Sequence, residues 1–403
     1  MSPLASLPHV SSPGPTATPG RPLRIVHFTN SQHRGGAEEH ILGLLRTLDA
    51  RRFQQILACP PGLAAALAAD VPAGARIHPV RLRHFRDAPA ALRFAGWLRR
   101  QQTDIVHCHL FYSSLFATPL ARMAQVPVVI ETPHLREHWR QGWKAHFGLD
   151  RMIGRGVSGY IAVSQANGAY LRQVKRLPGR KIHIILNGVA LARFAPSPAA
   201  ARAAAIHRAA LGLAPADPLL LGPGRLEAQK GHAVLLAAMP PLRSAYPRLH
   251  AVFAGSGALE PALRAQAAAL GLASVVHFPG HQSDITAWLA AADVVILPSW
   301  FEGLPLAAIE ALAAARPVVA TAVDGTVELV RHEQTGLLVA PGDAPALAAA
   351  VSRLLADPEL ARRLGSAGQD WSRQFDIQRQ AAATAALYLT LWQRGQQGRR
   401  EQP

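Results

Sequence analysis

Two glutamates in the stretch FEGLPLAAIEAL, Glu302 and Glu310, are the first candidates for chemistry. Glu302 precedes an expected helix start, and Glu310 is the only charged side chain in the apolar, alanine-rich helix expected between Leu304 and Ala315. Burying a carboxylate without a partner is costly, so Glu310 should meet a partner or face a cleft. This spacing is compatible with a general acid and base, with a metal-binding pair, or with acceptors for a polar ligand.

Glycines and cations follow the first expected strand of each half of the chain. The strand at 23–28 runs into a loop with Gly35 and Gly36, and the corresponding loop of the second half carries Arg225 and Lys230. Glycines at a strand-to-helix turn let backbone amides approach a phosphate at the positive helix end. Two cations on such a loop suit a diphosphate.

The turn between the two glutamates adds backbone hydrogen-bond donors to the loops that follow the strands. Pro305 is suited to the first helical position, which leaves the amides of Gly303 and Leu304 free to point at an anion. The second half thus gathers cations, amides and two carboxylates. That combination suits a nucleotide whose diphosphate meets the cations and whose ribose diol donates to one carboxylate. The alternative is a set of solvated surface acids and a structural one, with no ligand.

Strands and helices must position these loops. Along the sequence, short apolar runs alternate with helical patterns, which predicts parallel sheets built from βαβ units. The chain of 403 residues is long enough for two such domains. Ligands of these sheets bind at the carboxyl ends of the strands, so two facing sheets would form a cleft. Strands are predicted at 23–28, 55–59, 75–80, 104–109, 126–131, 160–164 and 181–186 in the first half, and at 218–222, 250–255, 275–280, 293–298, 317–322 and 336–340 in the second.

Five segments are expected along the chain. They are a disordered lead at 1–20, a first α/β domain at 21–193, a connection at 194–217, a second α/β domain at 218–375, and a final helix at 376–403 that crosses back to the first domain. No run of about 18 apolar residues occurs, so no membrane span is expected. The two cysteines suggest no disulfide framework, which favours a reducing, cytoplasmic setting.

Positive charge is concentrated in the first half. Residues 21–190 hold 24 Lys or Arg against 9 Asp or Glu, a net of +15, whereas residues 191–403 hold 18 against 16, a net of +2. The asymmetry indicates an anionic partner, such as nucleic acid, an anionic membrane surface or an acidic substrate. The segment 81–100 fits a basic membrane-surface helix. It fits equally well an ordinary helix that packs Phe94, Trp97 and Leu98 inward.

His107 and His109 share one face of the strand HCH and, with Cys108, invite a zinc interpretation. A third and a fourth ligand at suitable spacing are missing, so no metal site is predicted. No Asp-x-Asp motif follows a strand, which disfavours a metal-bridged nucleotide. No cofactor is expected.

Several stretches together carry a family resemblance. They are GGAEEHILGLL (35–45), GRLEAQKGH (224–232), VFAGSGALEPAL (252–263), the run from 278 to 321 that contains FEGLPLAAIEAL, and DGTVELVRHEQTGLLV (324–339). Over about residues 23–390 the chain resembles glycosyltransferase family 4, whose members are retaining enzymes with the GT-B fold of two Rossmann-like domains facing across a cleft. The Glu-x7-Glu segment is the most specific of these motifs.

The resemblance assigns roles to the second-domain residues. It implies that Glu302 contacts hydroxyls of the donor sugar and that Glu310 binds the nucleotide ribose. Arg225 and Lys230 match the basic pair that holds the diphosphate and stabilises its charge as it leaves. The amides of Gly303 and Leu304 then belong to the donor site.

The resemblance also assigns roles in the first domain. Gly35 and Gly36 match a loop that closes over the phosphates and sugar, and His134 matches an active-site histidine near the sugar. The set expected to take part in catalysis is His134, Arg225, Lys230 and Glu302. The family is thought to retain configuration by front-side attack, with the leaving phosphate accepting the acceptor's proton.

The function expected from this resemblance is transfer of a sugar from a nucleotide-diphosphate donor, UDP- or GDP-linked, to a glycan or lipid-linked acceptor. The setting would be cell-surface polysaccharide or glycolipid biosynthesis at the inner face of the membrane. One alternative is a nucleotide-sugar epimerase of the same fold. Another is a basic nucleic-acid-binding protein, although the sequence contains neither aromatic–arginine repeats nor a nucleic-acid motif.

Overall fold

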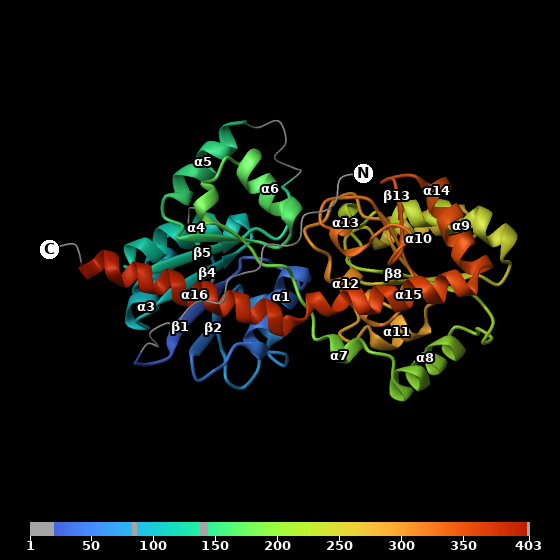
Figure 1. Cartoon of the computed structure of the whole chain (residues 1–403), viewed down its shortest axis with the longest axis horizontal. Coiled ribbons are helices and arrows are strands. Elements are labelled where there is room, and N and C mark those ends of the chain that lie inside the picture. Colours follow the sequence, from blue (N-terminus) through green and yellow to red (C-terminus); the bar gives the residue numbers. More distant parts are fainter. Residues whose placement is uncertain (1–19, 83–86, 138–143, 401–403) are drawn as a thin grey trace.

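Two parallel β-sheets lie side by side in the computed structural model, which describes residues 20–82, 87–137 and 144–400 (Figure 1). The predicted lead at 1–20 lies almost wholly outside these residues. The first sheet contains β1 (Leu23–Phe28), β2 (Phe53–Cys59), β3 (Arg76–Pro79), β4 (Ile105–His109), β5 (Val128–Thr132), β6 (Gly159–Ala162) and β7 (Ile182–Ile184). The second contains β8 (Leu219–Pro223), β9 (His250–Ala254), β10 (Val276–His277), β11 (Val294–Leu297), β12 (Val318–Thr321) and β13 (Leu337–Val339).

Each predicted strand therefore has a counterpart among the described residues. The apolar runs form strands because helices bury both faces of a parallel sheet, which favours continuous Val, Ile and Leu over alternation. All residues of β4, β5, β11 and β12 are buried. The predicted α/β fold of two doubly wound sheets is confirmed.

In both sheets the strand order reverses between the first and the fourth strand of the domain. The first has the order β3-β2-β1-β4-β5-β6-β7, and the second has β10-β9-β8-β11-β12-β13. In each, the strand pairs are parallel, and the first strand of the domain lies beside its fourth. Ligands of such sheets bind outside the carboxyl ends of these central strands, where neighbouring connections diverge to opposite faces.

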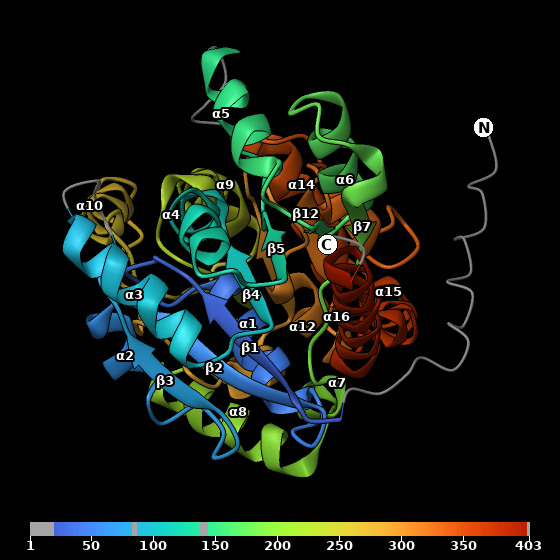
Figure 2. The ribbon, with the colours of Figure 1, turned by 90° about the vertical axis from the view of Figure 1, so that its left-hand side faces the viewer.

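Helices cover both faces of the first sheet (Figure 2). Apolar residues of α3 and α4 pack on one face, and residues of α1 and α16 pack on the other. The helices of this domain are α1 (Gly36–Thr47), α2 (Pro61–Leu67), α3 (Ala88–Arg100), α4 (Phe111–Met123), α5 (Lys144–Gly154), α6 (Gln165–Gln173) and η3 (Gly179–Lys181).

The second sheet is covered in the same way. Its helices are α7 (Leu191–Phe194), α8 (Pro198–Ala210), η4 (Ala228–Lys230), α9 (His232–Ala245), α10 (Glu260–Ala269), α11 (Thr286–Ala291), α12 (Leu306–Ala313), α13 (Thr326–Leu329), α14 (Ala344–Ala356), α15 (Pro358–Ser372) and η5 (Arg373–Phe375). The segment expected as a connection is therefore partly helical, and Ala204 of α8 belongs to the core that also contains residues of α11 and α12.

The last helix, α16 (Ile377–Arg400), runs from the second domain along the first (Figure 1). Ile377 lies against Gly43 of α1, where an added Cβ would meet its Cδ1 at 2.9 Å. Further along, Tyr388 is fully buried in the core of the first sheet. The chain thus ends by tying the two domains together.

The basic segment at 81–100 packs as an ordinary helix over its described part. Phe94 and Leu98 of α3 are buried in the core of the first sheet, and Trp97 stacks on His78 with ring centroids 3.9 Å apart. Within the described residues, no helix is both long and apolar enough to cross a membrane.

Candidate active site

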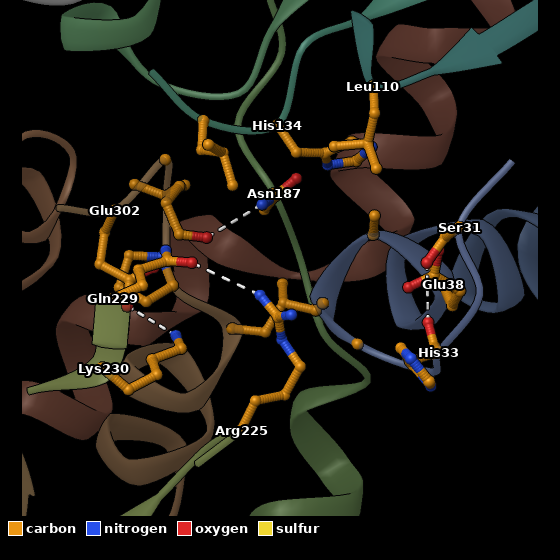
Figure 3. A pocket seen from close by; sticks show the side chains of 18 residues that line it. Ser31, His33, Glu38, Leu110, His134, Asn187, Arg225, Gln229, Lys230 and Glu302 are labelled. Carbon is orange, nitrogen blue, oxygen red and sulfur yellow. Dashed lines mark hydrogen bonds and ion pairs between the residues drawn. The ribbon is translucent and has the colours of Figure 1, made fainter. Parts of the chain in front are cut away.

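A pocket of about 210 Å³ lies where the loops of the two domains meet (Figure 3). Its walls come from the loops after β1, β4, β5 and β7 of the first domain and after β8 and β11 of the second. The pocket therefore opens at the carboxyl ends of both sheets. Its lining residues are Ser31, His33, Gly35, Gly36, Ala37, Glu38, Leu110, His134, Leu135, Asn187, Arg225, Gln229, Lys230, Glu302, Gly303, Leu304, Pro305 and Leu306.

The two predicted cations line this pocket on the loop between β8 and α9. Gly224, with φ of +133°, and Gly231, with φ of +64°, give this loop backbone conformations that other residues rarely adopt. Lys230 Nζ lies 2.6 Å from Oε1 of Glu302. Among the described residues, the side chain of Arg225 makes one long hydrogen bond within its own loop, 3.4 Å from Nη2 to Oε1 of Gln229. Its guanidinium is therefore available for an anion.

Arg225 also reaches across to the first domain. A Cβ at Gly35 would lie 3.5 Å from Cδ and Nε of Arg225. No neighbouring atom of the described residues lies within 4 Å of the position that a Cβ at Gly36 would take, so this backbone is open to a ligand. The structure brings the predicted glycine pair and the predicted cations to opposite walls of one pocket.

Glu302 lies in the wall of the pocket that the second domain forms, and it is 7% exposed. Besides Lys230, Ser299 Oγ donates to its Oε1 at 2.7 Å. Its own amide donates to Oδ2 of Asp324 at 3.2 Å. Helix α12 begins at Leu306 with Pro305 as its N-cap, so the predicted first helical position of Pro305 is wrong by one residue.

Glu310 does not line this pocket, unlike the other predicted second-domain residues. It lies in α12, and burial, followed by the carboxylate of Glu39, raises the pKa of Glu310 to about 7. Lys230 and Arg193 are near enough to act in the opposite direction. Glu310 is half-buried, and a half-buried acid beside another acid would be stabilised by a hydrogen-bond donor, so its role toward a ribose stays a prediction.

His134 lines the pocket from the loop after β5 and is 8% exposed. Burial holds the pKa of His134 well below its usual range, so the ring is neutral at pH 7. Its Nε2 lies 3.2 Å from Nδ1 of His109, which connects it to a cluster of buried histidines in the first domain. Two groups of three in this cluster place ring nitrogens close enough to hold a metal ion.

Glu38 and Asn187 are two of the pocket residues that were not identified from the sequence. Glu38, in the first turn of α1, is 2% exposed, and burial raises the pKa of Glu38 to about 7. Asn187 is 5% exposed and its Nδ2 donates to the carbonyl of Leu304 at 2.9 Å. The acidic pair after Gly36 and the Asn-Gly turn after β7 were the available signals for these residues.

Further contacts hold the domains together beside the pocket. Arg136 Nε forms an ion pair with Oδ1 of Asp324 at 3.0 Å. The carboxylate of Glu328 accepts from the amides of Gln165 and Ala166, at 3.0 and 2.9 Å, where α6 begins. A carboxylate at a helix N-terminus is stabilised by the exposed amides and the helix dipole. The pocket therefore lies in a closed cleft.

Comparison with known proteins identifies related sequences for both domains. The family model described as Glycosyl transferases group 1 matches residues 204–371, and the model of Glycosyltransferase Family 4 matches residues 34–193. The glycogen synthase of Mycobacterium tuberculosis is 35% identical over 308 residues, which cover 74% of this chain and 71% of that protein. The lipopolysaccharide core biosynthesis mannosyltransferase LpsB of Rhizobium meliloti is 33% identical over 256 residues, which cover 62% and 70%.

Solved structures share the fold over nearly the whole chain. Anabaena HepE in complex with UDP-glucose has a TM-score of 0.79 at 22% identity, covering 91% of this chain and 100% of that one. The sucrose-phosphate synthase from Thermosynechococcus elongatus has a TM-score of 0.76 at 25% identity, covering 92% and 99%. These structures share the two-domain GT-B arrangement.

Proposed function

Because the chain belongs to the group 1 glycosyltransferases of the GT-B type, we propose that it moves a sugar from a nucleoside-diphosphate donor to a glycan or lipid-linked acceptor. The setting proposed is the synthesis of cell-surface polysaccharide or glycolipid. The observation that carries the proposal is the pairing of Arg225 and Lys230 on one wall of the pocket with Gly35 and Gly36 on the other. Cations facing an open glycine backbone suit a diphosphate.

The charge of each pocket residue indicates its role in the reaction. Breaking the anomeric bond places negative charge on the departing diphosphate, and fixed cations and amides aimed there lower the barrier. Arg225, Lys230 and the amides of Gly303 and Leu304 supply these groups. The hydrogen bonds that the carboxylate of Glu302 accepts within the described residues both use Oε1, so we assign its Oε2 to a hydroxyl of the donor sugar.

Retention of configuration by front-side attack is part of the proposal. The lining carboxylates are Glu38 and Glu302. Glu302 is already engaged by Lys230, and Glu38, with its pKa near 7, is about half protonated at neutral pH. The ion pair with Lys230 occupies Glu302, and Glu38 lies on the first-domain wall, so the proposal uses neither carboxylate as a nucleophile. We therefore assign the acceptor's proton to the leaving phosphate, and the neutral ring of His134 to the sugar.

The donor is tested by thermal shift with UDP-, GDP- and ADP-sugars, because a ligand of the folded state raises the melting temperature by mass action. The bound UDP-glucose of HepE favours UDP as the first nucleotide to test. We expect one nucleotide to stabilise the wild type and to lose its effect in Arg225→Ala. A protein that none of the three stabilises would contradict the proposal.

A nucleotide-sugar epimerase of this fold is distinguished by the product. The enzyme is incubated with the stabilising nucleotide sugar, with and without a glycan or lipid-linked acceptor. A transferase releases free nucleoside diphosphate faster when the acceptor is present, whereas an epimerase converts the sugar without any acceptor.

The basic first domain motivates an anionic membrane surface or acceptor as partner. Its net charge of +15 over residues 21–190 predicts flotation with anionic vesicles that weakens with salt, because exposed charges are screened over about 8–10 Å at physiological ionic strength. Equal flotation with neutral vesicles would contradict this part of the proposal. Salt-sensitive binding to duplex DNA without vesicle binding would favour a nucleic-acid partner.

A further inference from the structure

Five buried histidines lie close together in the first domain beneath the pocket and form what we call the histidine cluster. They come from β1, α1, β4 and the loop after β5, and no member is more than 8% exposed. Burial lowers the pKa of each ring, so every member is neutral at pH 7 and carries one ring proton. A neutral imidazole has one donor nitrogen and one acceptor nitrogen, so hydrogen bonds between such rings have a direction. The members are His27, His40, His107, His109 and His134.

Three of these rings form a hydrogen-bonded chain that begins in the core and ends at the pocket. Nδ1 of His27 lies 3.2 Å from Nε2 of His109, and Nδ1 of His109 lies 3.2 Å from Nε2 of His134. Each contact needs one protonated and one unprotonated nitrogen. The position of the proton on the first ring therefore determines the tautomers of the other two. These bonds use both ring nitrogens of His109, which accounts for the close approach of nitrogens in the cluster.

Gln55 of β2 determines the direction of this chain. Its Nε2 donates to the carbonyl oxygen of Leu45 at 3.2 Å, and a carbonyl oxygen can only accept. Oε1 of Gln55 then faces Nε2 of His27 at 3.2 Å, so that nitrogen must carry the proton. Gln55 is 3% exposed, and reversing its amide would bring two buried acceptor oxygens together at Leu45, which is costly.

The direction passes along the chain to the pocket. With its proton on Nε2, His27 has a lone pair on Nδ1, which accepts from Nε2–H of His109. His109 in turn accepts at Nδ1 from Nε2–H of His134. The ring of His134 therefore holds its proton on Nε2 and its lone pair on Nδ1.

Nδ1 of His134 is the end of the chain that a ligand can reach. His134 lines the pocket (Figure 3). Its Nδ1 makes no hydrogen bond within the described residues, and it is not one of the fully buried polar atoms that lack a partner there. The ring of His40 packs edge-on against that of His134, with centroids 4.7 Å apart and planes at 85°, which holds the ring in place. An acceptor nitrogen is thus presented to the pocket.

We propose that Gln55 and His27 are positioning residues, which hold His134 in the tautomer whose lone pair faces the donor sugar. They act through His109. This inference rests on the proposed function, which places His134 at the sugar. Breaking the anomeric bond gives the sugar ring positive charge, as in the oxocarbenium-like transition states of glycoside hydrolysis. A lone pair stabilises that charge or accepts from a sugar hydroxyl, whereas an N–H aimed at the sugar would oppose the charge.

The tautomer is tested on the full-length protein without ligand, so this measurement does not depend on the transferase proposal. Histidine is labelled with ¹⁵N, because protonated and unprotonated ring nitrogens differ widely in chemical shift, and their couplings to the ring hydrogens distinguish Nδ1 from Nε2. His134→Gln identifies the signals of His134 by their absence. We expect a protonated Nε2 and an unprotonated Nδ1. A wild type with the proton on Nδ1 of His134 would overturn the proposal.

Gln55→Leu tests the origin of the direction. Without Oε1, either tautomer of His27 leaves its Nε2 without a partner, so we expect the second tautomer of His134, with Nδ1 protonated, to become populated. Gln55→Met, unbranched like glutamine, guards against a leucine variant that fails to fold. Gln54→Leu is the matched control, because Gln54 accepts from Arg24 at 3.2 Å and lies outside the chain. It should leave the tautomer unchanged. An unchanged tautomer in a folded Gln55 variant would overturn the proposal.

Transfer then tests the use of this tautomer. With the nucleotide sugar that stabilises the wild type, Gln55→Leu should transfer about tenfold more slowly, the scale of one hydrogen bond. Affinity for the free nucleoside diphosphate, which lacks the donor sugar, should be unchanged. Normal transfer by a variant whose tautomer has shifted would overturn the role at the sugar. If no nucleotide sugar stabilises the wild type, the proposed function fails, and the tautomer measurement still decides whether Gln55 sets the direction of the chain.

Discussion

Gly303 of the second domain lies directly against the carbonyl oxygen of His134 in the first. A Cβ at position 303 would be 1.7 Å from that oxygen, a separation that no side chain tolerates. The turn between Glu302 and α12 can therefore approach the loop after β5 only as glycine. This contact joins the donor-side wall of the pocket to the histidine that we place at the sugar.

Gly303→Ala should separate the two walls. We expect transfer to fall by roughly 10²-fold, since a misplacement of about 1 Å costs that much in a positioned site. Nucleotide affinity should fall less, because Arg225 and Lys230 lie on a different loop. Gly62→Ala is the control, since an added Cβ there meets nothing within 4 Å. Normal transfer by Gly303→Ala would show that the walls need not meet.

Lys230→Ala tests the cation that is paired with Glu302. It should reduce transfer by roughly 10²-fold and weaken nucleotide binding less, because charge on the diphosphate grows as the bond breaks. Steady-state kinetics and calorimetry on one preparation separate the two effects. Arg264→Ala removes a cation from an exposed pair with Glu260 and should change neither quantity. If Lys230→Ala affects only binding, the lysine does not act in the transition state.

The sequence predicted the residues that line the pocket better than the residues that pack behind them. Arg225, Lys230 and Glu302 could be placed because each follows a strong apolar strand, and parallel strands deliver their loops to one edge. Glu310 was grouped with them because it is the lone charge of an apolar helix and because of the family resemblance, but its position within α12 keeps it from lining this pocket. The tilt of a helix relative to a cleft depends on tertiary packing and leaves no local signal.

The histidine cluster shows a second reason for what was missed. His40 contacts Asn187 and Gln380, which are 147 and 340 residues away in the chain. Neither partner belongs to a motif, and Gln380 comes from a helix that returns from the other domain. Contacts of this kind depend on the relative placement of the two sheets, which the periodicity of single strands does not encode.

Glu310 should make nucleotide binding depend on pH. The ionised carboxylate is the better acceptor for a ribose diol. With a pKa near 7 in the free protein, its ionised fraction rises between pH 6 and pH 8. The affinity lost in Glu310→Gln should therefore be larger at pH 8 than at pH 6. Calorimetry with the nucleoside diphosphate on both proteins cancels titration of the phosphate. Equal losses at the two pH values would remove Glu310 from the ribose site.

The same group should affect stability without ligand. Its pKa is raised from 4.5 to about 7 on folding, so between these values the folded state binds more protons than the unfolded state, and stability falls as pH rises. Glu310→Gln lacks this loss. We expect the variant to melt above the wild type at pH 8 and close to it at pH 4.5. A variant that melts below the wild type at pH 8 would contradict the burial argument.

Lys175 should be a main support of the first domain. It is 1% exposed, and its Nζ lies 2.9 Å from carboxylate oxygens of both Glu137 and Asp150. Glu131 is buried nearby, and its pKa is raised to about 7, first by burial. Removing the cation takes one positive charge away from three buried acids. Breaking a buried pair from one side costs about 3–5 kcal/mol, so Lys175→Met should lower the free energy of unfolding by that order.

The loss in Lys175→Met should also grow with pH. Without Lys175, the folded-state pKa of Glu131 rises further above its unfolded value of 4.5. Because the folded state then holds extra protons, stability decreases as pH rises through that range. Urea unfolding at pH 5 and pH 8 should show a larger gap between variant and wild type at pH 8. Lys181→Met is the matched control, since Lys181 donates to the carbonyls of Gly154 and Val157, which do not titrate. Its loss should be the same at both pH values. A pH-independent loss in Lys175→Met would mean that packing of the lysine stem, and not its charge, supports this part of the domain.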